Sequence, residues 1–167
     1  MDGPHSFDDF RGIIQELRRG CPWDKAQTLS SLKPSLFGEM AETAAGVSLC
    51  EKTGNGENLC EELGDLLMVL MLMSRIAEED GLFSIDDVIE SASRKMIRRH
   101  PHVFGTGFVD ENGDLVRGWK EIKRLEKAGK SQEELKGQED AVKEAVKELA
   151  AYYSQETEGQ ETETEIS

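Results

Sequence analysis

The chain has 167 residues, a formal net charge of −14 at pH 7, and 37% hydrophobic but only 6% aromatic residues. This length suits one domain with a sizeable core, and the lean aromatic content suits helices that pack through Leu, Met and Ala. The negative charge argues against nonspecific binding to nucleic acid or to anionic membranes.

The three cysteines, Cys21, Cys50 and Cys60, form no Cys-x-x-Cys pair. This favours a reducing cytosol over a disulfide framework or a zinc knuckle. Residues 1–10 are polar and acidic, unlike a signal peptide. The longest uninterrupted apolar run, Leu66–Met73, is too short to span a bilayer. We therefore expect a soluble, cytoplasmic protein that does not act at a membrane.

The first expected helix covers about residues 6–19, where apolar side chains recur with a helical period. Ser6 is its expected N-cap, and Gly20 with Pro22 ends it. Residues 21–28 show no clear period, so we expect a loop there.

Two longer helices are expected at about residues 31–51 and 57–79, joined by the turn Gly54-Asn55-Gly56. Pro34 falls in the first turn of the earlier helix, where its missing N–H costs little. Leu66–Met73 is apolar on all sides and must be covered completely by neighbours. We favour a subunit interface for part of that cover, because a small bundle rarely covers every face of one helix.

Further helices are expected from Ser84, as N-cap, to about Arg99, and at about residues 118–127. Residues 108–116 hold an Asn-Gly step between β-forming residues, which favours a short hairpin or an irregular loop. We therefore predict one folded all-α domain over residues 1–128.

The character of the chain changes at Gly129. Residues 129–167 are expected to form an acidic extension that is partly helical over about 133–153. The acidic, low-complexity residues 154–167 are expected to be disordered.

Four acidic residues occur as two pairs with a spacing of three, Glu39 with Glu42 and Glu62 with Asp65. Such positions share one face of a helix, with Cβ atoms roughly 5–6 Å apart, and apolar residues flank both pairs. Carboxylates in apolar surroundings are costly to bury without a compensating charge. If the two helices pack antiparallel, the carboxylates converge, which predicts a site for Mg²⁺. The alternative is chance, because Asp and Glu supply 34 of the 167 residues.

A set of short motifs resembles the MazG family of nucleoside triphosphate pyrophosphohydrolases, which are related to the dimeric dUTPases. The motifs are Cys21-Pro22-Trp23-Asp24, Gln27-Thr28, Glu39-x-x-Glu42, Glu61-Glu62-Leu63-Gly64-Asp65 and the long segment Lys95–Gly105. The resemblance runs from about Phe7 to Lys127. It implies an all-α, four-helix-type bundle that usually dimerises, binds Mg²⁺ (for which Mn²⁺ can substitute), and converts a nucleoside triphosphate and water into a monophosphate and pyrophosphate.

The metal motif of the family falls on Glu39, Glu42, Glu62 and Asp65. Two positions depart from the family pattern. Gly38 stands where a second Glu is frequent, but this position lies about 100° around the helix from Glu39, so we expect the metal site to be retained. Leu29 stands where His is common, which affects what can be expected of the substrate.

The general base is expected to be a carboxylate left partly free of metal, and Glu42 and the adjacent Glu61 are the candidates. The competing interpretation of Glu61 is a solvated helix residue.

Basic and aromatic residues are the candidates for substrate binding. Lys95 and Arg99 lie four apart on one helix face and suit phosphate oxygens, although a surface basic run would look the same. Trp119 and Lys123 are also four apart, and the family resemblance assigns them base stacking and phosphate or base contact. The alternative for Trp119 is a packing residue.

Trp23 and Gln27 precede the first acidic pair and could line the base pocket. The alternative for Trp23 is a loop residue that covers the core.

The predicted function is Mg²⁺-dependent hydrolysis of nucleoside triphosphates in nucleotide-pool housecleaning, by a homodimer or a higher homo-oligomer. One competing hypothesis is a helical regulatory or adaptor module that binds nucleotide without cleaving it, which rests on Gly38 and Leu29. A weaker one is an RNA-associated protein that uses the basic run 94–99, against which the net acidity counts.

Overall fold

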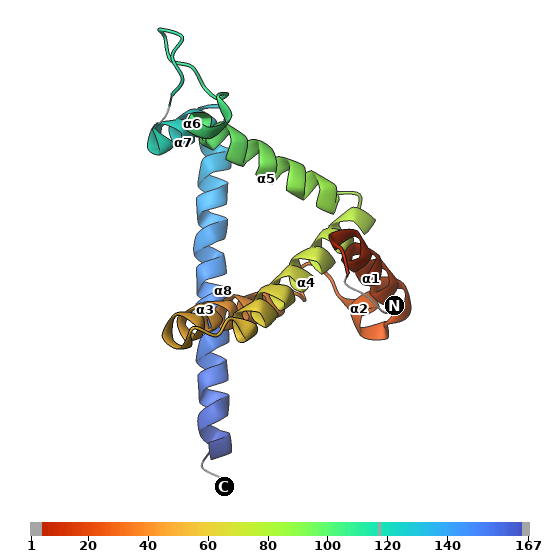
Figure 1. Cartoon of the computed structure of the whole chain (residues 1–167). Coiled ribbons are helices and arrows are strands. Elements are labelled where there is room, and N and C mark those ends of the chain that lie inside the picture. Colours follow the sequence, from red (N-terminus) through yellow and green to blue (C-terminus); the bar gives the residue numbers. More distant parts are fainter. Residues whose placement is uncertain (1–4, 117, 165–167) are drawn as a thin grey trace. The chain divides into compact units, whose positions relative to one another are not determined.

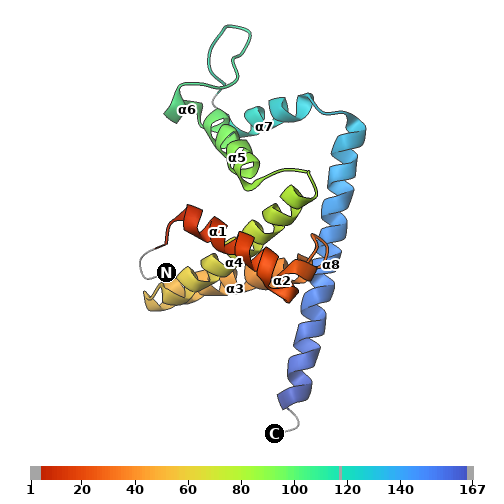
Figure 2. The same cartoon turned by 90° about the vertical axis from the view of Figure 1, so that its right-hand side faces the viewer.

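The computed structural model describes residues 5–116 and 118–164, with 155–164 described as backbone alone. Within these residues all named elements are α-helices, and the β-structure is limited to an isolated bridge between Val109 and Leu115. The expected all-α class and the extra C-terminal helix are therefore confirmed. Contacts divide the chain into two compact units, Met1–Val88 and Ile89–Ser167, whose helices can be followed in Figures 1 and 2. The division expected at residue 128 stays a prediction.

The first unit begins with α1 (Phe7–Gly20), which starts where the sequence predicts. Ser6 caps it: the Asp9 amide donates to Ser6 Oγ at 3.2 Å, and the Ser6 amide donates to the Asp9 carboxylate at 2.8 Å. This reciprocal pair satisfies two N–H groups that a bare helix end leaves unpaired.

The loop expected at residues 21–28 is wrong in part, because Pro22–Ala26 forms the short helix α2. Pro22 stands in the first turn, where its fixed φ favours the helix. Arg18 binds the carbonyl oxygens of Asp24 and Gln27, the latter at 3.2 Å, and so stabilises the C-terminal end of α2. A helix of five residues is too short to show a period in the sequence.

The long helices α3 (Lys33–Thr53) and α4 (Glu57–Glu79) pack side by side as an antiparallel pair (Figure 2). Gly54 ends α3 with φ of +74°, a conformation that L side chains rarely adopt. Gly46 is buried where α3 meets α4, and a Cβ atom there would lie 3.2 Å from the Cα of Leu59. The absence of a side chain at Gly46 therefore sets how closely the two helices approach.

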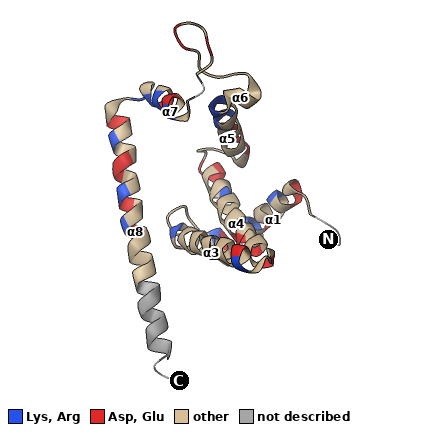
Figure 3. Ribbon diagram, turned by 60° about the vertical axis from the view of Figure 1, so that its left-hand side comes forward, with Lys and Arg blue, Asp and Glu red and all other residues tan. Residues whose placement is uncertain are grey.

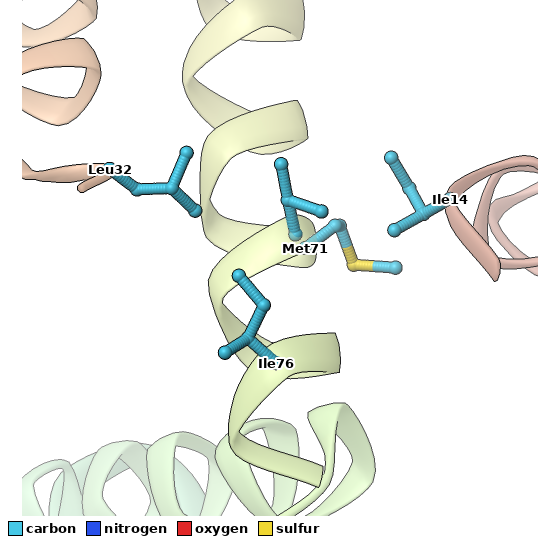
Figure 4. Packing of buried hydrophobic residues seen from close by; sticks show 5 residues of the cluster. Ile14, Leu32, Met71 and Ile76 are labelled. Atoms are coloured by element: carbon cyan, nitrogen blue, oxygen red, sulfur yellow. The ribbon is translucent and has the colours of Figure 1, made fainter. Parts of the chain in front are cut away.

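The core of the first unit lies around α4. Ile14 from α1 and Leu32, just before α3, approach α4 from opposite sides, as Figure 4 shows. Met71, Leu72 and Ile76 of α4 complete this cluster, and each is at most 4% exposed. Burial of such a side chain contributes about 1.5–3 kcal/mol.

The apolar run of α4 is covered only in part by the chain itself. Leu67 and Leu70 are 39% and 46% exposed, and Met40 of α3 and Leu63 of α4 are 47% and 51% exposed. Apolar side chains thus remain uncovered on both helices, as an interface with another subunit requires.

The helix α5 (Ile85–Arg99) continues from the first unit into the second. Ser84 caps it as predicted, because the Asp87 amide donates to Ser84 Oγ at 3.2 Å. A four-residue helix, α6 (Pro101–Phe104), follows. The loop at 108–116 is a tight turn, in which the Asp110 carboxylate accepts the amides of Asn112 and Asp114.

The second unit ends with α7 (Trp119–Ala128) and α8 (Gln132–Thr164). The backbone of α8 continues beyond residue 153, where the sequence predicts helix to end; Glu and Gln, frequent in this segment, are good helix formers. The rest of the predicted disordered tail, residues 165–167, lies outside the described residues. Across the described helices, none combines the length and the apolar character that crossing a membrane requires.

Candidate metal centre and basic surface

Carboxylates from two helices gather in the first unit. Glu39 and Glu42 of α3 and Glu62 of α4 each place one carboxylate oxygen within 4.8 Å of the other two. The spacing of three puts Glu39 and Glu42 on one face of α3, and the antiparallel packing brings Glu62 against that face. Oxygens at such distances match the donor set of a hard divalent cation.

The electrostatics of this carboxylate cluster (Glu39, Glu42 and Glu62) fit a bound cation. Glu39 Oε2 is buried and has no hydrogen-bond partner among the described residues. Burial raises the pKa of Glu39, and the charges of Glu42, Asp65 and Glu62 raise it further. A buried carboxylate without a donor is unfavourable by itself. The geometry therefore supplies negative charge that a divalent ion would neutralise.

The other carboxylates of the motif lie differently. Asp65 is not one of the three residues whose oxygens gather within 4.8 Å, although its charge contributes to the raised pKa of Glu39. Glu61 is exposed and also lies outside the group. A direct contact to metal by Asp65 and a role for Glu61 as base stay predictions.

Two neighbours that were not predicted from the sequence hold Glu62 in place. Asn58 Nδ2 donates to Glu62 Oε1 at 2.7 Å, and the Thr43 hydroxyl of α3 donates to the Glu62 carbonyl at 3.3 Å. Asn58 lies one helical turn before Glu62, so its i, i+4 spacing was the available signal. Gly46 keeps the helices close here, since an added Cβ would lie 3.4 Å from Glu62 Cγ.

Basic residues line a hollow of about 840 Å³ in the second unit. In Figure 3, blue marks Lys and Arg positions on the ribbon at the end of α5 and on α7. The basic residues that line the hollow are Lys95, Arg98, Arg99, Lys120, Lys123, Arg124, Lys127 and Lys130. Lys95 and Arg99, the predicted phosphate ligands, therefore share one surface with Lys123, for which phosphate or base contact is predicted.

Trp119 lies beside two of these cations. The Arg99 guanidinium carbon is 5.2 Å and Lys123 Nζ is 5.3 Å from the centroid of the indole ring. The ring of His100 is 5.5 Å away. Trp119 is still 42% exposed, so part of its surface is open to a ligand.

Glu126 binds both arginines of this surface. Its Oε1 accepts from Arg98 Nε and Nη2 at 2.8 and 2.6 Å, and its Oε2 accepts from Arg99 Nε and Nη2 at 3.1 and 2.7 Å. The hydrogen bonds from Arg99, ahead of those from Arg98, hold the pKa of Glu126 below its ordinary value. Glu126 was not predicted from the sequence, although it lies seven residues after Trp119 on one face of α7.

Trp23 and Gln27 lie in and just after α2. Trp23 is 59% exposed and does not cover the core. Gln27 Nε2 donates to the Trp23 carbonyl at 3.1 Å, and its Oε1 accepts from Ser31 Oγ at 2.6 Å. The amide of Gln27 thus orders this segment, while Leu29 packs against the core cluster.

Comparison with known proteins decides the family. Residues 27–104 match the MazG nucleotide pyrophosphohydrolase domain, a range that contains the carboxylate cluster, Lys95 and Arg99. Over these residues the chain belongs to the MazG family. The MazG match ends before Trp119 and Lys123.

Relatives extend this likeness over about three quarters of the chain. The MazG nucleoside triphosphate pyrophosphohydrolase/pyrophosphatase of Thermotoga maritima is 42% identical over 126 residues, covering 74% of this chain and 46% of that protein. The nucleoside triphosphate pyrophosphohydrolase of Escherichia coli K12 is 34% identical over 131 residues, covering 77% and 48%. The uncharacterized protein YabN of Bacillus subtilis is 44% identical over 125 residues, covering 74% and 25%. The chain spans a quarter to about half the length of these relatives.

A solved structure agrees with the all-α MazG fold. The crystal structure of a mazG-related protein from Thermotoga maritima superimposes with a TM-score of 0.54 at 26% identity, covering 70% of this chain and 98% of that one.

Proposed function

We propose that this protein is a Mg²⁺-dependent hydrolase that converts nucleoside triphosphates into nucleoside monophosphates and pyrophosphate. The observation that carries the proposal is the carboxylate cluster, in which the buried Glu39 oxygen lacks a donor. The relatives from Thermotoga maritima and Escherichia coli are nucleoside triphosphate pyrophosphohydrolases, which supports the choice of reaction. Removal of noncanonical or surplus nucleotides is the proposed purpose.

In the proposed site, Glu39, Glu42 and Glu62 hold the metal, with Asp65 as a fourth ligand. When bound, the ion neutralises charge on phosphate oxygens and lowers the pKa of coordinated water. Glu42, which is exposed at the edge of the cluster, is one candidate to accept a proton from the attacking water, and Glu61 is the other. Asn58 fixes the orientation of Glu62 by its 2.7 Å hydrogen bond, which keeps the carboxylates positioned before substrate arrives.

The proposed substrate contacts combine cations with an aromatic ring. Lys95, Arg99 and Lys123 offer donors to phosphate oxygens, and the Arg99 guanidinium presents a planar set that suits two oxygens at once. The exposed part of Trp119 suits stacking on a base. Trp23 and Gln27 are proposed to contribute to the base pocket.

A homodimer is the proposed assembly. Leu67 and Leu70 on α4 and Met40 on α3 are more than a third exposed, and a second copy would bury them. Sedimentation equilibrium of the full chain tests this proposal, and a monomer at micromolar concentration would contradict it.

The reaction is tested by incubating the full chain with ribo- and deoxyribonucleoside triphosphates, ordinary and damaged, and with Mg²⁺ or Mn²⁺. Monophosphate and pyrophosphate in equal amounts are expected, as separated by ion-exchange chromatography. Release of inorganic phosphate instead would contradict cleavage between the α and β phosphates. Nucleotide binding without any turnover would favour the adaptor hypothesis.

A further inference from the structure

One carboxylate stands among the cations that line the hollow of the second unit. Glu126 is the only acidic residue among the described residues that line it. Its side chain is 14% exposed and receives four hydrogen bonds of 3.1 Å or less from Arg98 and Arg99. Glu126 is therefore not a solvated surface charge, and its placement needs a reason.

The hydrogen bonds of Glu126 restrict Arg99 strongly. A free arginine side chain carries about 2 kcal/mol of rotamer entropy, which is lost whenever the guanidinium must adopt one position to bind a ligand. Two N–H groups of Arg99 are already bound to Glu126 Oε2, and its guanidinium lies 5.2 Å from the centroid of the Trp119 ring. A guanidinium has five N–H donors, so three remain for an anion. Arg99 is thus held in one orientation with donors to spare.

The charge of this surface stays positive although Glu126 is ionised. Glu126 offsets one of the two positive charges of Arg98 and Arg99, and Lys95 and Lys123 line the same hollow. An anion still meets a net cationic surface. Glu126 fixes the orientation of Arg99, but its negative charge weakens the attraction of this surface for an anion. These two effects have opposite signs, so an experiment separates them.

We propose that Glu126 is a positioning residue that holds Arg99 ready for the triphosphate of the substrate. The inference rests on the proposed function for the identity of the anion. Glu126 itself touches neither phosphate nor base. It acts through Arg99, so its removal matters only while Arg99 is present.

The matched control lies on the same helix. Glu121 pairs with Arg124 through two hydrogen bonds of 2.9 and 2.6 Å, the same kind of contact as Glu126 makes with Arg99. The Glu121–Arg124 pair is exposed, with side chains 46% and 68% accessible. Glu121→Gln removes one carboxylate from α7 without touching Arg99, and so controls for net charge and helix stability.

Calorimetry on the full chain measures binding of a nucleoside triphosphate analogue with a methylene bridge between the α and β phosphates, in the presence of Mg²⁺. Inorganic tripolyphosphate, which lacks a base, is measured in parallel. We expect Glu126→Gln to weaken both about tenfold, equivalent to ~1.4 kcal/mol, and Glu121→Gln to change neither by more than about twofold. In an Arg99→Lys background, Glu126→Gln should have no further effect, because coupled residues are not additive.

Two further measurements keep the inference open to refutation. Glu126→Asp keeps the charge but withdraws the carboxylate by one methylene, so it should also weaken binding, and this holds even where Glu126→Gln fails to fold. Binding by Glu126→Gln that equals or exceeds that of the parent overturns the inference, because Glu126 then only competes with the anion. The failures are distinguishable: a chain that binds tripolyphosphate through Arg99 but cleaves nothing refutes the proposed function alone.

Discussion

The two charged clusters of this protein are built in opposite ways. In the first unit, Glu39, Glu42 and Glu62 gather like charges, and a buried oxygen of Glu39 has no hydrogen-bond partner among the described residues. In the second unit, Glu126 already neutralises part of the charge of Arg98 and Arg99. The first cluster gathers like charges that the proposed cation would neutralise, whereas the second is held together by its own ion pairs.

The difference shows how each cluster responds to its ligand. Repulsion among the carboxylates disappears when a cation binds, so binding there should stabilise the fold. The arginines are fixed before an anion arrives, so binding there should require little rearrangement. The proposed cation site and the proposed anion site therefore differ already in the free protein.

The largest expected effect is on turnover when the metal cluster loses a ligand. Glu62→Gln should lower nucleoside triphosphate hydrolysis by more than about 100-fold. A loss of about 100-fold is the upper limit for residues that only support a metal ligand, and Glu62 is proposed to be a ligand itself. Glu51→Gln, an exposed residue on α3, is the control and should leave the rate unchanged. Steady-state pyrophosphate release measures both, and comparable rates for the two variants would contradict the metal assignment.

Metal binding should stabilise the parent and not Glu39→Gln. At Mg²⁺ a hundredfold above its Kd, the free energy of unfolding should rise by about 2.7 kcal/mol. Without metal, Glu39→Gln should be more stable than the parent, because the substitution removes a repelled, partly buried charge. Thermal unfolding with and without Mg²⁺ measures both effects. If Glu39→Gln were less stable than the parent in the presence of a chelator, this would contradict the repulsion among the carboxylates that distinguishes the first cluster from the second.

The close approach of α3 and α4 is tested at Gly46. Gly46→Val should lower the free energy of unfolding by about 1–3 kcal/mol, the usual cost of overpacking, and should weaken Mg²⁺ binding by displacing Glu62. Gly12 on α1 has nothing within 4 Å of an added Cβ. Gly12→Ala is therefore the control and should raise the free energy of unfolding by up to about 1 kcal/mol. Denaturant unfolding measures both variants. Equal changes in the free energy of unfolding would show that α3 and α4 can accommodate the added side chain at Gly46.

The smallest expected effect concerns acid stability. The Arg18 hydrogen bonds, with further contributions from Arg75, lower the pKa of Glu79 below its ordinary 4.5. Because the folded pKa is the lower one, the stabilisation is present above the unfolded pKa and is lost as pH falls through the folded pKa. The opposite holds for Glu39, whose raised pKa favours the folded state as pH falls.

Glu79→Gln should therefore flatten the loss of stability below about pH 4.5. Glu16→Gln, which breaks the exposed pair with Arg19, should leave the acid limb unchanged. Unfolding midpoints measured from pH 3 to 7 distinguish the two variants.

Much of the helical fold could be predicted because capping residues mark where helices begin. Ser6 and Ser84 both form the expected caps, and the predicted helix at 57–79 agrees with α4. The short α2 could not be predicted, since its stability depends on Arg18 reaching carbonyl oxygens six and nine residues away. A period analysis does not register such a contact.

The candidate site was predictable only as far as local spacing extends. Glu39 and Glu42 meet Glu62 because α3 and α4 pack antiparallel, an arrangement that the spacing of the carboxylates presupposes but does not establish. Glu126 was not foreseen, because its partners Arg98 and Arg99 lie 28 and 27 residues away in the chain. Asn58 was overlooked for another reason: its side chain supports a ligand, and no chemistry singles out an asparagine.

Arg18 has one more consequence. Its guanidinium binds Glu79 at the end of α4 and the carbonyls of Asp24 and Gln27 around α2. If Trp23 and Gln27 hold the base, discrimination among nucleotides also depends on Arg18, a half-buried arginine that supports their segment without meeting the substrate. Directed evolution for a new base preference would then succeed by exchanging Arg18 or Glu79, which support this segment, as readily as by exchanging Trp23 or Gln27.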